Sequence, residues 1–136
     1  MRILAIDYGR KKCGIAVTDP LQLIATGLTT VPTHGLLDWL DDYLRVEEVG
    51  DIVVGESRKE DGTHNAIQQE IVGFERKLAK RYPGLTLHRQ DEFYSSRRAR
   101  EAMLEMGMKK QQRRDKQTVD RIAAALILQD FLEERR

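Results

Sequence analysis

The first eighteen residues constrain the possible folds of this chain more than any other stretch. Arg2–Asp7 is apolar on both faces, which is typical of a strand at the centre of a sheet, and Lys12–Thr18 forms a second apolar run. The turn between the two strands is too short for a crossover, so the strands are expected to be antiparallel. Asp7 ends the first strand, and the basic run Arg10–Lys12 follows it. The chain therefore places an acid at the tip of a buried strand, beside a group of positive charges.

The rest of the chain alternates between strands and helices. Strands are predicted at 24–31, 51–55 and 85–90, and helices at 33–48, 64–81, 95–105 and from 117 or 118 to 133, with a polar loop at 56–62. A meander followed by alternating helices and strands indicates an α/β fold with a mixed sheet and helices on its faces. A length of 136 residues, 40% of them hydrophobic, fits one domain spanning 1–136.

Composition narrows the possible classes of function. The net charge of +1 excludes a strong polycation, so nucleic-acid binding must depend on local basic patches. Cys13 is the single cysteine and forms no internal disulfide, which suits a reducing compartment. We see no charged leader and no apolar run near the ~20 residues needed to cross a bilayer. These features predict a cytoplasmic protein without a membrane partner.

Three acidic positions stand out from the surface acids. Asp7 ends a strand, although it also suits a turn-forming role before a glycine. Asp91 and Glu92 end the predicted fifth strand, where ligands collect in parallel sheets, although one of them could instead cap the next helix. Asp120 shares a helix face with apolar residues, although a first-turn acid is also favoured by the helix dipole.

If these carboxylates converge, they need a bridging cation. Hard oxygen ligands suit Mg²⁺ or Mn²⁺, and no His or Cys set has zinc-like spacing. Positive charge lies beside two of the acids: Asp7 is followed by Arg10, Lys11 and Lys12, and Asp120 is preceded by Lys109, Lys110, Arg113, Arg114 and Lys116. Cations around a metal-binding acid cluster suit a nucleic-acid substrate, although such a segment could also be a solvated surface.

These motifs resemble the YqgF/RuvX family of small bacterial proteins. "AIDYGRKKCGIAVTD" is similar to the family's opening motif, "DIVVG" to its fourth-strand motif, and "KKQQRRDKQTVDRIAAALILQDFL" to its ending. The resemblance spans nearly the whole chain. It implies a ribonuclease H-like fold, in which strands one to three form an antiparallel meander and strands four and five are parallel. It also implies a nuclease related to Holliday junction resolvases and involved in maturing the 5′ end of 16S pre-rRNA.

Two departures from the family pattern matter. Phe93 stands where an Arg is expected after the paired acids Asp91 and Glu92, so a positive group near the substrate is missing. Glu56 and Ser57 replace the usual Leu-Pro after the fourth strand, so contacts from that loop are not carried over.

The resemblance implies metal-binding carboxylates at Asp7, Glu92 and Asp120. Asp91 is the alternative to Glu92, because a bulge or the end of the strand can re-aim either side chain. Two Mg²⁺ or Mn²⁺ ions about 3.5–4 Å apart would clamp the scissile phosphate. The substrate is expected to be pre-rRNA or branched DNA, with ribosomal precursor particles as a further partner. The alternatives are a DNA junction resolvase, a binding protein without catalysis, and an ATPase that would need a second domain.

Overall fold

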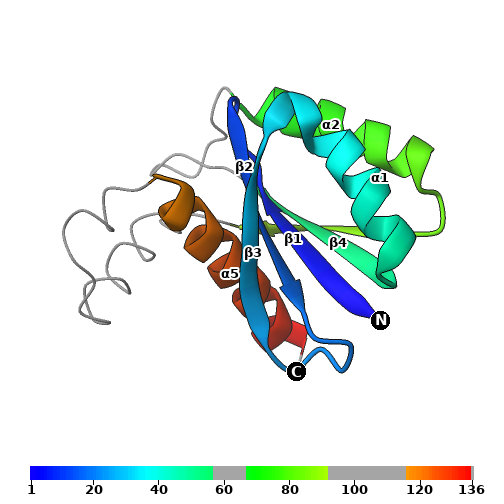
Figure 1. Ribbon diagram of the computed structural model, residues 1–136, viewed down its shortest axis with the longest axis vertical. Helices are drawn as coiled ribbons and strands as arrows, with labels where there is room; N and C mark the ends of the chain where they lie inside the picture. The colour runs from blue at the N-terminus through cyan, green and yellow to red at the C-terminus, as the bar shows by residue number, and fades with distance from the viewer. Residues whose placement is uncertain (57–66, 92–115, 136) are drawn as a thin grey trace.

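The computed structural model describes residues 1–56, 67–91 and 116–135 of the chain. The elements in these ranges are β1 (Arg2–Asp7), β2 (Lys12–Thr18), β3 (Ala25–Pro32), η1 (Thr33–Gly35), α1 (Leu36–Val46), β4 (Val49–Glu56), α2 (Gln68–Arg81), β5 (Thr86–Asp91) and α5 (Lys116–Arg135). The five strands form one sheet in the order β3-β2-β1-β4-β5 (Figure 1). β1 to β3 are antiparallel, whereas β1, β4 and β5 run parallel, which confirms the predicted mixed sheet.

Helices cover both faces of the sheet (Figure 1). Alternating side chains of β1 belong to two separate cores: Leu4 and Ile6 pack on the side of α1 and α2, whereas Ile3 and Ala5 pack on the side of α5. All four side chains are fully buried. The continuous apolar run of β1 is therefore explained by its place at the centre of a sheet that is covered on both sides.

Two glycines let α5 lie unusually close to the sheet. A Cβ atom on Gly14 of β2 would stand 2.1 Å from the backbone oxygen of Asp120, and one on Gly27 of β3 would stand 3.0 Å from that of Arg121. A side chain at Gly14 is therefore incompatible with the observed position of the helix. This contact brings the first turns of α5 directly over β2.

Several predicted boundaries differ from the observed ones for reasons of tertiary pairing. The strand predicted at 51–55 begins at Val49, because Val49 pairs with Arg2 of β1. Glu56, predicted to be the first loop residue, is instead the last residue of β4, because it pairs with Asp91. The helix predicted from residue 33 starts as a 3-10 turn before α1. The helix predicted at 95–105 lies outside the described residues. Among the described helices, none is long and apolar enough to span a membrane.

Candidate active site

Asp7 lies at the carboxyl edge of the sheet, as predicted. It is the last residue of β1, it is partly buried, and its register partner on β2 is Gly14. The parallel strands β4 and β5 end at the same edge, where Glu56 and Asp91 are paired. The carboxyl ends of three parallel strands therefore meet beside Asp7, which is where open α/β sheets bind their ligands.

Asp120 reaches the same place from the other end of the chain. The backbone and Cβ of Asp120 lie against Gly14, which is the residue paired with Asp7. Burial is the main reason that the pKa of the neighbouring Cys13 thiol is raised, and the negative charges of Asp7 and Asp120 both add to the increase. Two carboxylates that are far apart in sequence thus act on one buried thiol, so we conclude that α5 brings Asp120 to the Asp7 edge of the sheet.

The third predicted ligand remains a prediction. β5 ends at Asp91, at the same edge of the sheet as Asp7. The side chain of Asp91 is not described, and Glu92 lies outside the described residues. In the part of the chain that the structure describes, no group of three or more His, Cys, Asp or Glu side chains is placed to hold a metal ion. Asp7 and Asp120 supply hard carboxylate oxygens, and this donor chemistry fits Mg²⁺ or Mn²⁺ if a third acid from the end of β5 joins them.

The basic turn (Arg10–Lys12) is held in place by Thr33, a residue that the sequence pattern does not reveal. The Thr33 hydroxyl donates a hydrogen bond of 2.6 Å to the Gly9 carbonyl oxygen, and its backbone N–H donates one of 2.9 Å to the carbonyl oxygen of Lys11. Gly9 is required here, because a Cβ atom would stand 2.4 Å from the carbonyl oxygen of Lys12. The side chains of the basic turn are exposed. Their positive charges therefore face solvent directly after Asp7.

The basic turn also contacts α2. The Arg10 Nε atom lies 3.3 Å from a carboxylate oxygen of Glu70, and both side chains are largely exposed. The Tyr8 ring packs on that of Phe74, with 5.1 Å between the ring centroids. The first part of α2 therefore lies beside the residues that directly follow Asp7.

Cys13 is a packing residue rather than a nucleophile. Its side chain is fully buried, and burial raises the pKa of the thiol, so the reactive thiolate is disfavoured at neutral pH. The Cys13 sulfur contacts the Thr33 hydroxyl at 3.4 Å and the Gly9 carbonyl oxygen at 3.8 Å. Cys13 thus packs beneath the surface against Gly9 and Thr33, the residues that fix the basic turn.

The other predicted phosphate-binding cations are not placed by the structure. Lys109, Lys110, Arg113 and Arg114 lie outside the described residues. Lys116 is the first residue of α5, and its side chain is not described. Their proposed role remains a prediction from the sequence.

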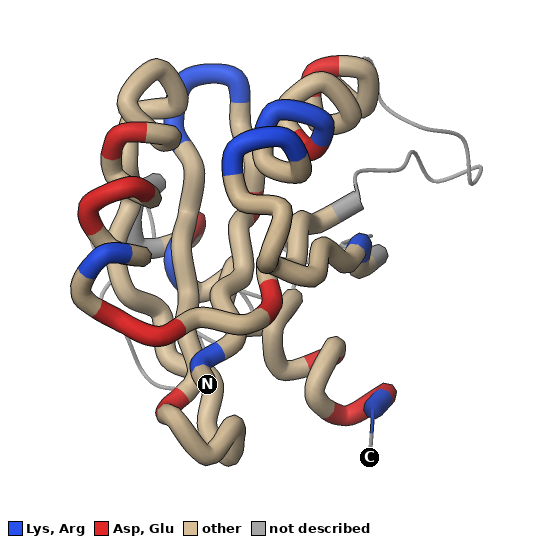
Figure 2. Tube along the Cα trace, turned by 90° about the vertical axis from the view of Figure 1, so that its right-hand side faces the viewer, with Lys and Arg blue, Asp and Glu red and all other residues tan. Residues whose placement is uncertain are grey.

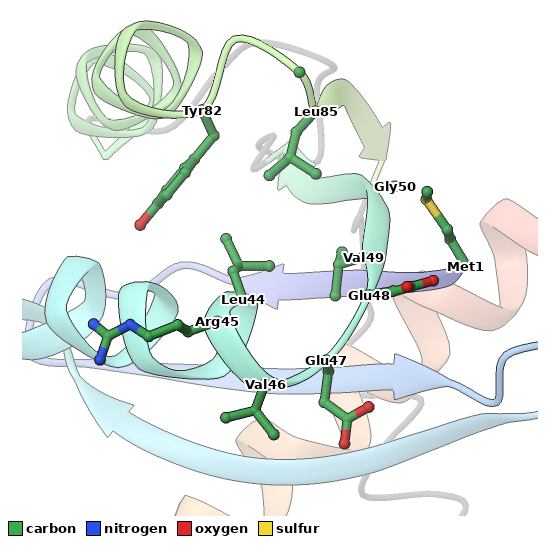
Figure 3. A pocket seen from close by; sticks show the side chains of 11 residues that line it. Met1, Leu44, Arg45, Val46, Glu47, Glu48, Val49, Gly50, Tyr82 and Leu85 are labelled. Carbon is green, nitrogen blue, oxygen red and sulfur yellow. The ribbon is translucent and has the colours of Figure 1, made fainter.

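A pocket of about 650 Å³ lies at the opposite edge of the sheet, between the end of α1 and the loop before β5 (Figure 3). Leu44, Val49 and Leu85 give it apolar walls, and Glu47 and Glu48 line it from the segment between α1 and β4. Glu47 forms an ion pair of 3.3 Å with Arg2. The pocket is therefore separate from the Asp7 edge and does not contribute to the candidate active site.

The architecture defined above is shared with resolvases of the ribonuclease H-like class. The crystal structure of fowlpox virus resolvase with substrate Holliday junction DNA superposes with a TM-score of 0.57, at 10% sequence identity over 99% of each chain. A second crystal structure, of the fowlpox virus Holliday junction resolvase, gives a TM-score of 0.54 at 14% identity, covering 98% of this chain and 99% of that one. At such low identity the similarity concerns the fold.

The chain belongs to the RuvX family, whose sequence profile is described as Holliday junction resolvase and matches residues 1–134. It is 46% identical over 135 residues to a protein of Bacteroides fragilis named "Putative pre-16S rRNA nuclease", covering 99% of this chain and 98% of the relative. Proteins of the same name from Porphyromonas gingivalis and Flavobacterium johnsoniae are 48% and 43% identical, covering 97% and 99% of this chain and 96% and 98% of the relatives. The family resemblance predicted from the sequence is therefore confirmed.

Proposed function

We propose that this protein is a metal-dependent nuclease that hydrolyses phosphodiester bonds in structured nucleic acid, and that it acts in the cytoplasm on the 5′ end of 16S pre-rRNA. The observation that carries the proposal is the approach of Asp7 and Asp120 to the two sides of Gly14. The family and the names of the relatives support a nuclease. Ribosomal precursor particles are the corresponding partner.

In this proposal the residues at the carboxyl edge of the sheet have distinct roles. Asp7, Asp120 and Glu92 hold Mg²⁺ or Mn²⁺ in a two-metal-ion site, with Asp91 as the alternative to Glu92. The metal supplies Lewis-acid stabilisation of the phosphate and lowers the pKa of bound water. Arg10 and Lys11 bind phosphates next to the scissile bond, and Thr33 keeps their turn in position. Gly14 lets the backbone that carries Asp120 approach Asp7.

The test is cleavage of a structured RNA and of a four-way DNA junction with Mg²⁺ or Mn²⁺. We expect Asp7→Asn and Asp120→Asn each to lower kcat by about 100-fold or more, because a ligand to a catalytic metal contributes several kcal/mol to the transition state. Asp42→Asn is the matched control, because Asp42 is an exposed carboxylate on α1. Full activity of Asp7→Asn would overturn the assignment.

The same experiment distinguishes two of the alternatives, the DNA resolvase and the binding protein. Cleavage of the junction but not of the RNA would identify a DNA resolvase, as the family description suggests for its members. Salt-sensitive binding of both probes without cleavage under either metal would identify a binding protein.

A further inference from the structure

The exposed face of α2 carries three cations that belong to no described ion pair. Arg76, Lys77 and Lys80 are exposed and share one face, because residues three and four apart on a helix are neighbours. We call them the α2 cation row. In residues 1–56, 67–91 and 116–135, no ion pair involves any of the three. Their charge is therefore available to an external anion.

The other charges of α2 are compensated. Glu70 pairs with Arg10, and Glu75 accepts two hydrogen bonds, of 3.0 and 2.9 Å, from the Nε atom of Arg89. Arg81 is bound to Asp41 of α1. The acids of α2 thus do not neutralise the cation row, and its net positive charge follows from these pairings.

The α2 cation row lies further along the helix whose first part contacts the candidate active site. The start of α2 lies beside the basic turn through the contacts of Glu70 with Arg10 and of Phe74 with Tyr8. From Glu70 to Lys80 the helix advances by about 15 Å, at ~1.5 Å per residue. The row itself begins at Arg76, about 9 Å along the helix from Glu70 at ~1.5 Å per residue, so it forms a second group of positive charge that lies away from the edge of the sheet.

The neighbouring helix α1 has the opposite charge. Figure 2 shows Lys and Arg on α2 and at the turn between β1 and β2, whereas the charged residues of α1 are three Asp and one Arg. Asp38 and Asp42 are exposed on α1, and Arg45 pairs within that helix with Asp42 at 3.3 Å. A polyanion on this face of the molecule is therefore attracted to α2 and repelled by α1.

We propose that the α2 cation row binds the phosphate backbone of the substrate on one side of the cut. This inference rests on the proposed nuclease function. The distance of about 15 Å from the start of α2 at Glu70 to Lys80, the last cation of the row, corresponds to about four or five base pairs, at ~3.4 Å per phosphate along each strand of a duplex. The occupant is thus a duplex arm that leaves the active site over α2, and the contact is to phosphates rather than to bases.

The first experiment measures binding without cleavage. A four-way DNA junction and an RNA hairpin are titrated in the presence of EDTA at several salt concentrations. For the triple variant Arg76→Gln, Lys77→Gln and Lys80→Gln, we expect the slope of log K against log salt to become shallower by about 3, because each lost phosphate contact removes about 1. Glutamine is a good helix former, so the variant should fold, which circular dichroism checks.

The matched comparison uses single variants. Lys80→Gln and Arg45→Gln each remove one exposed helical cation, but only Lys80 belongs to the row. We expect Lys80→Gln to reduce the salt slope by about 1 and Arg45→Gln to leave it unchanged. Equal effects of the two variants would show that only total charge matters, and would overturn the inference.

The second experiment separates this inference from the proposed function. Cleavage is measured on substrates whose arms are shorter than about four base pairs or as long as about twelve. We expect the triple variant to raise KM for long arms only and to leave kcat unchanged.

The outcomes separate the two proposals. If the wild type cuts neither probe, the nuclease proposal fails, and the salt slopes still test whether the α2 cation row binds nucleic acid. If cleavage is normal and the triple variant binds long arms like the wild type, the inference about α2 fails alone. A change confined to the RNA or to the DNA probe identifies which backbone the row binds.

Discussion

Gly14 is the residue on which the geometry of the candidate site depends most directly. It is the register partner of Asp7, and the backbone of Asp120 packs against it so closely that there is no room for a Cβ atom. Because the clash is with a backbone oxygen, the added atom cannot be accommodated by rotation of a flexible side chain. Any side chain at position 14 must therefore push α5 away from the sheet and Asp120 away from Asp7.

Gly14→Ala should consequently reduce both stability and activity. We expect the free energy of unfolding to fall by about 1–3 kcal/mol, as for overpacked cores, and cleavage to fall further than stability alone explains. Gly27→Ala is the matched control, because its Cβ atom would stand 3.0 Å from the Arg121 oxygen rather than 2.1 Å from that of Asp120. Urea unfolding and cleavage rates measure the two effects. Equal behaviour of the two variants would contradict the role assigned to Gly14.

Gln68 is a second residue whose surroundings allow a specific prediction, because it is a polar residue buried in the fold. Its side chain is 6% exposed, and neither amide atom finds a hydrogen-bond partner among the described residues. Gln68→Met should raise the free energy of unfolding by about 1 kcal/mol, since an unpaired buried amide is destabilising. The exposed neighbour gives the control: Gln69→Met should change stability by less than about 0.5 kcal/mol. A loss of stability in Gln68→Met, measured by urea unfolding, would mean that the amide is bonded in the folded protein.

At the scale of elements, the turn between β1 and β2 depends on a contact from the far end of β3. Thr33 directly follows β3, and its hydroxyl and N–H bind the carbonyl oxygens of Gly9 and Lys11. The basic turn is therefore a supported element whose shape is imposed by a neighbouring strand.

Thr33→Val should weaken this support while keeping the size of the side chain. We expect the free energy of unfolding to fall by about 1 kcal/mol, which is typical of one hydrogen bond, and nucleic-acid affinity to fall because the basic turn is less ordered. Thr33→Ser keeps the hydroxyl and should retain most of the stability and affinity. The contradicting result is a valine variant that binds RNA and DNA as tightly as the wild type.

Sequence patterns predict this fold well because its strands are marked locally. The sequence alone shows the apolar runs of β1 and β2, and it shows that Asp7 ends the first of them, because these features need no information about distant residues. The start of β4 at Val49 is not, because it depends on parallel pairing with Arg2. Thr33 is missed for the same reason, since its partners Gly9 and Lys11 lie in a distant turn. Strand alternation also does not choose between Asp91 and Glu92, because both lie at the end of β5, so this choice stays a prediction.

At the scale of the whole molecule, charge is divided between neighbouring helices on one face of the sheet. The same face carries an acidic α1 and the α2 cation row. The two helices are joined by Asp41 in the middle of α1, which accepts hydrogen bonds from Arg81 at the end of α2 and from the hydroxyl of Tyr82. This link holds α2, and therefore its cations, in a fixed relation to α1. The net charge of +1 hides this division, which is why composition alone excludes a polycation but not a nucleic-acid-binding surface.

The interaction of Asp41 with Arg81 and Tyr82 makes the stability of the fold depend on pH in the acid range. Hydrogen bonds from Arg81 and Tyr82 lower the pKa of the Asp41 carboxyl from 3.8 to about 2. A carboxyl with a lowered pKa in the folded state stabilises the fold fully above its unfolded value, and this contribution disappears as pH falls from about 4 toward about 2.

A double-mutant cycle between Asp41→Asn and Arg81→Gln measures this contribution by urea unfolding at several pH values. We expect a favourable coupling at pH 7 that shrinks through the window between about 4 and 2, because protonated Asp41 no longer pairs with Arg81 as an ion. High salt should weaken the coupling at pH 7, since both groups reach solvent. A coupling that stays constant down to the lowest pH would show that the charge of Asp41 does not hold the two helices together, and that α1 and α2 keep their places through the apolar core alone.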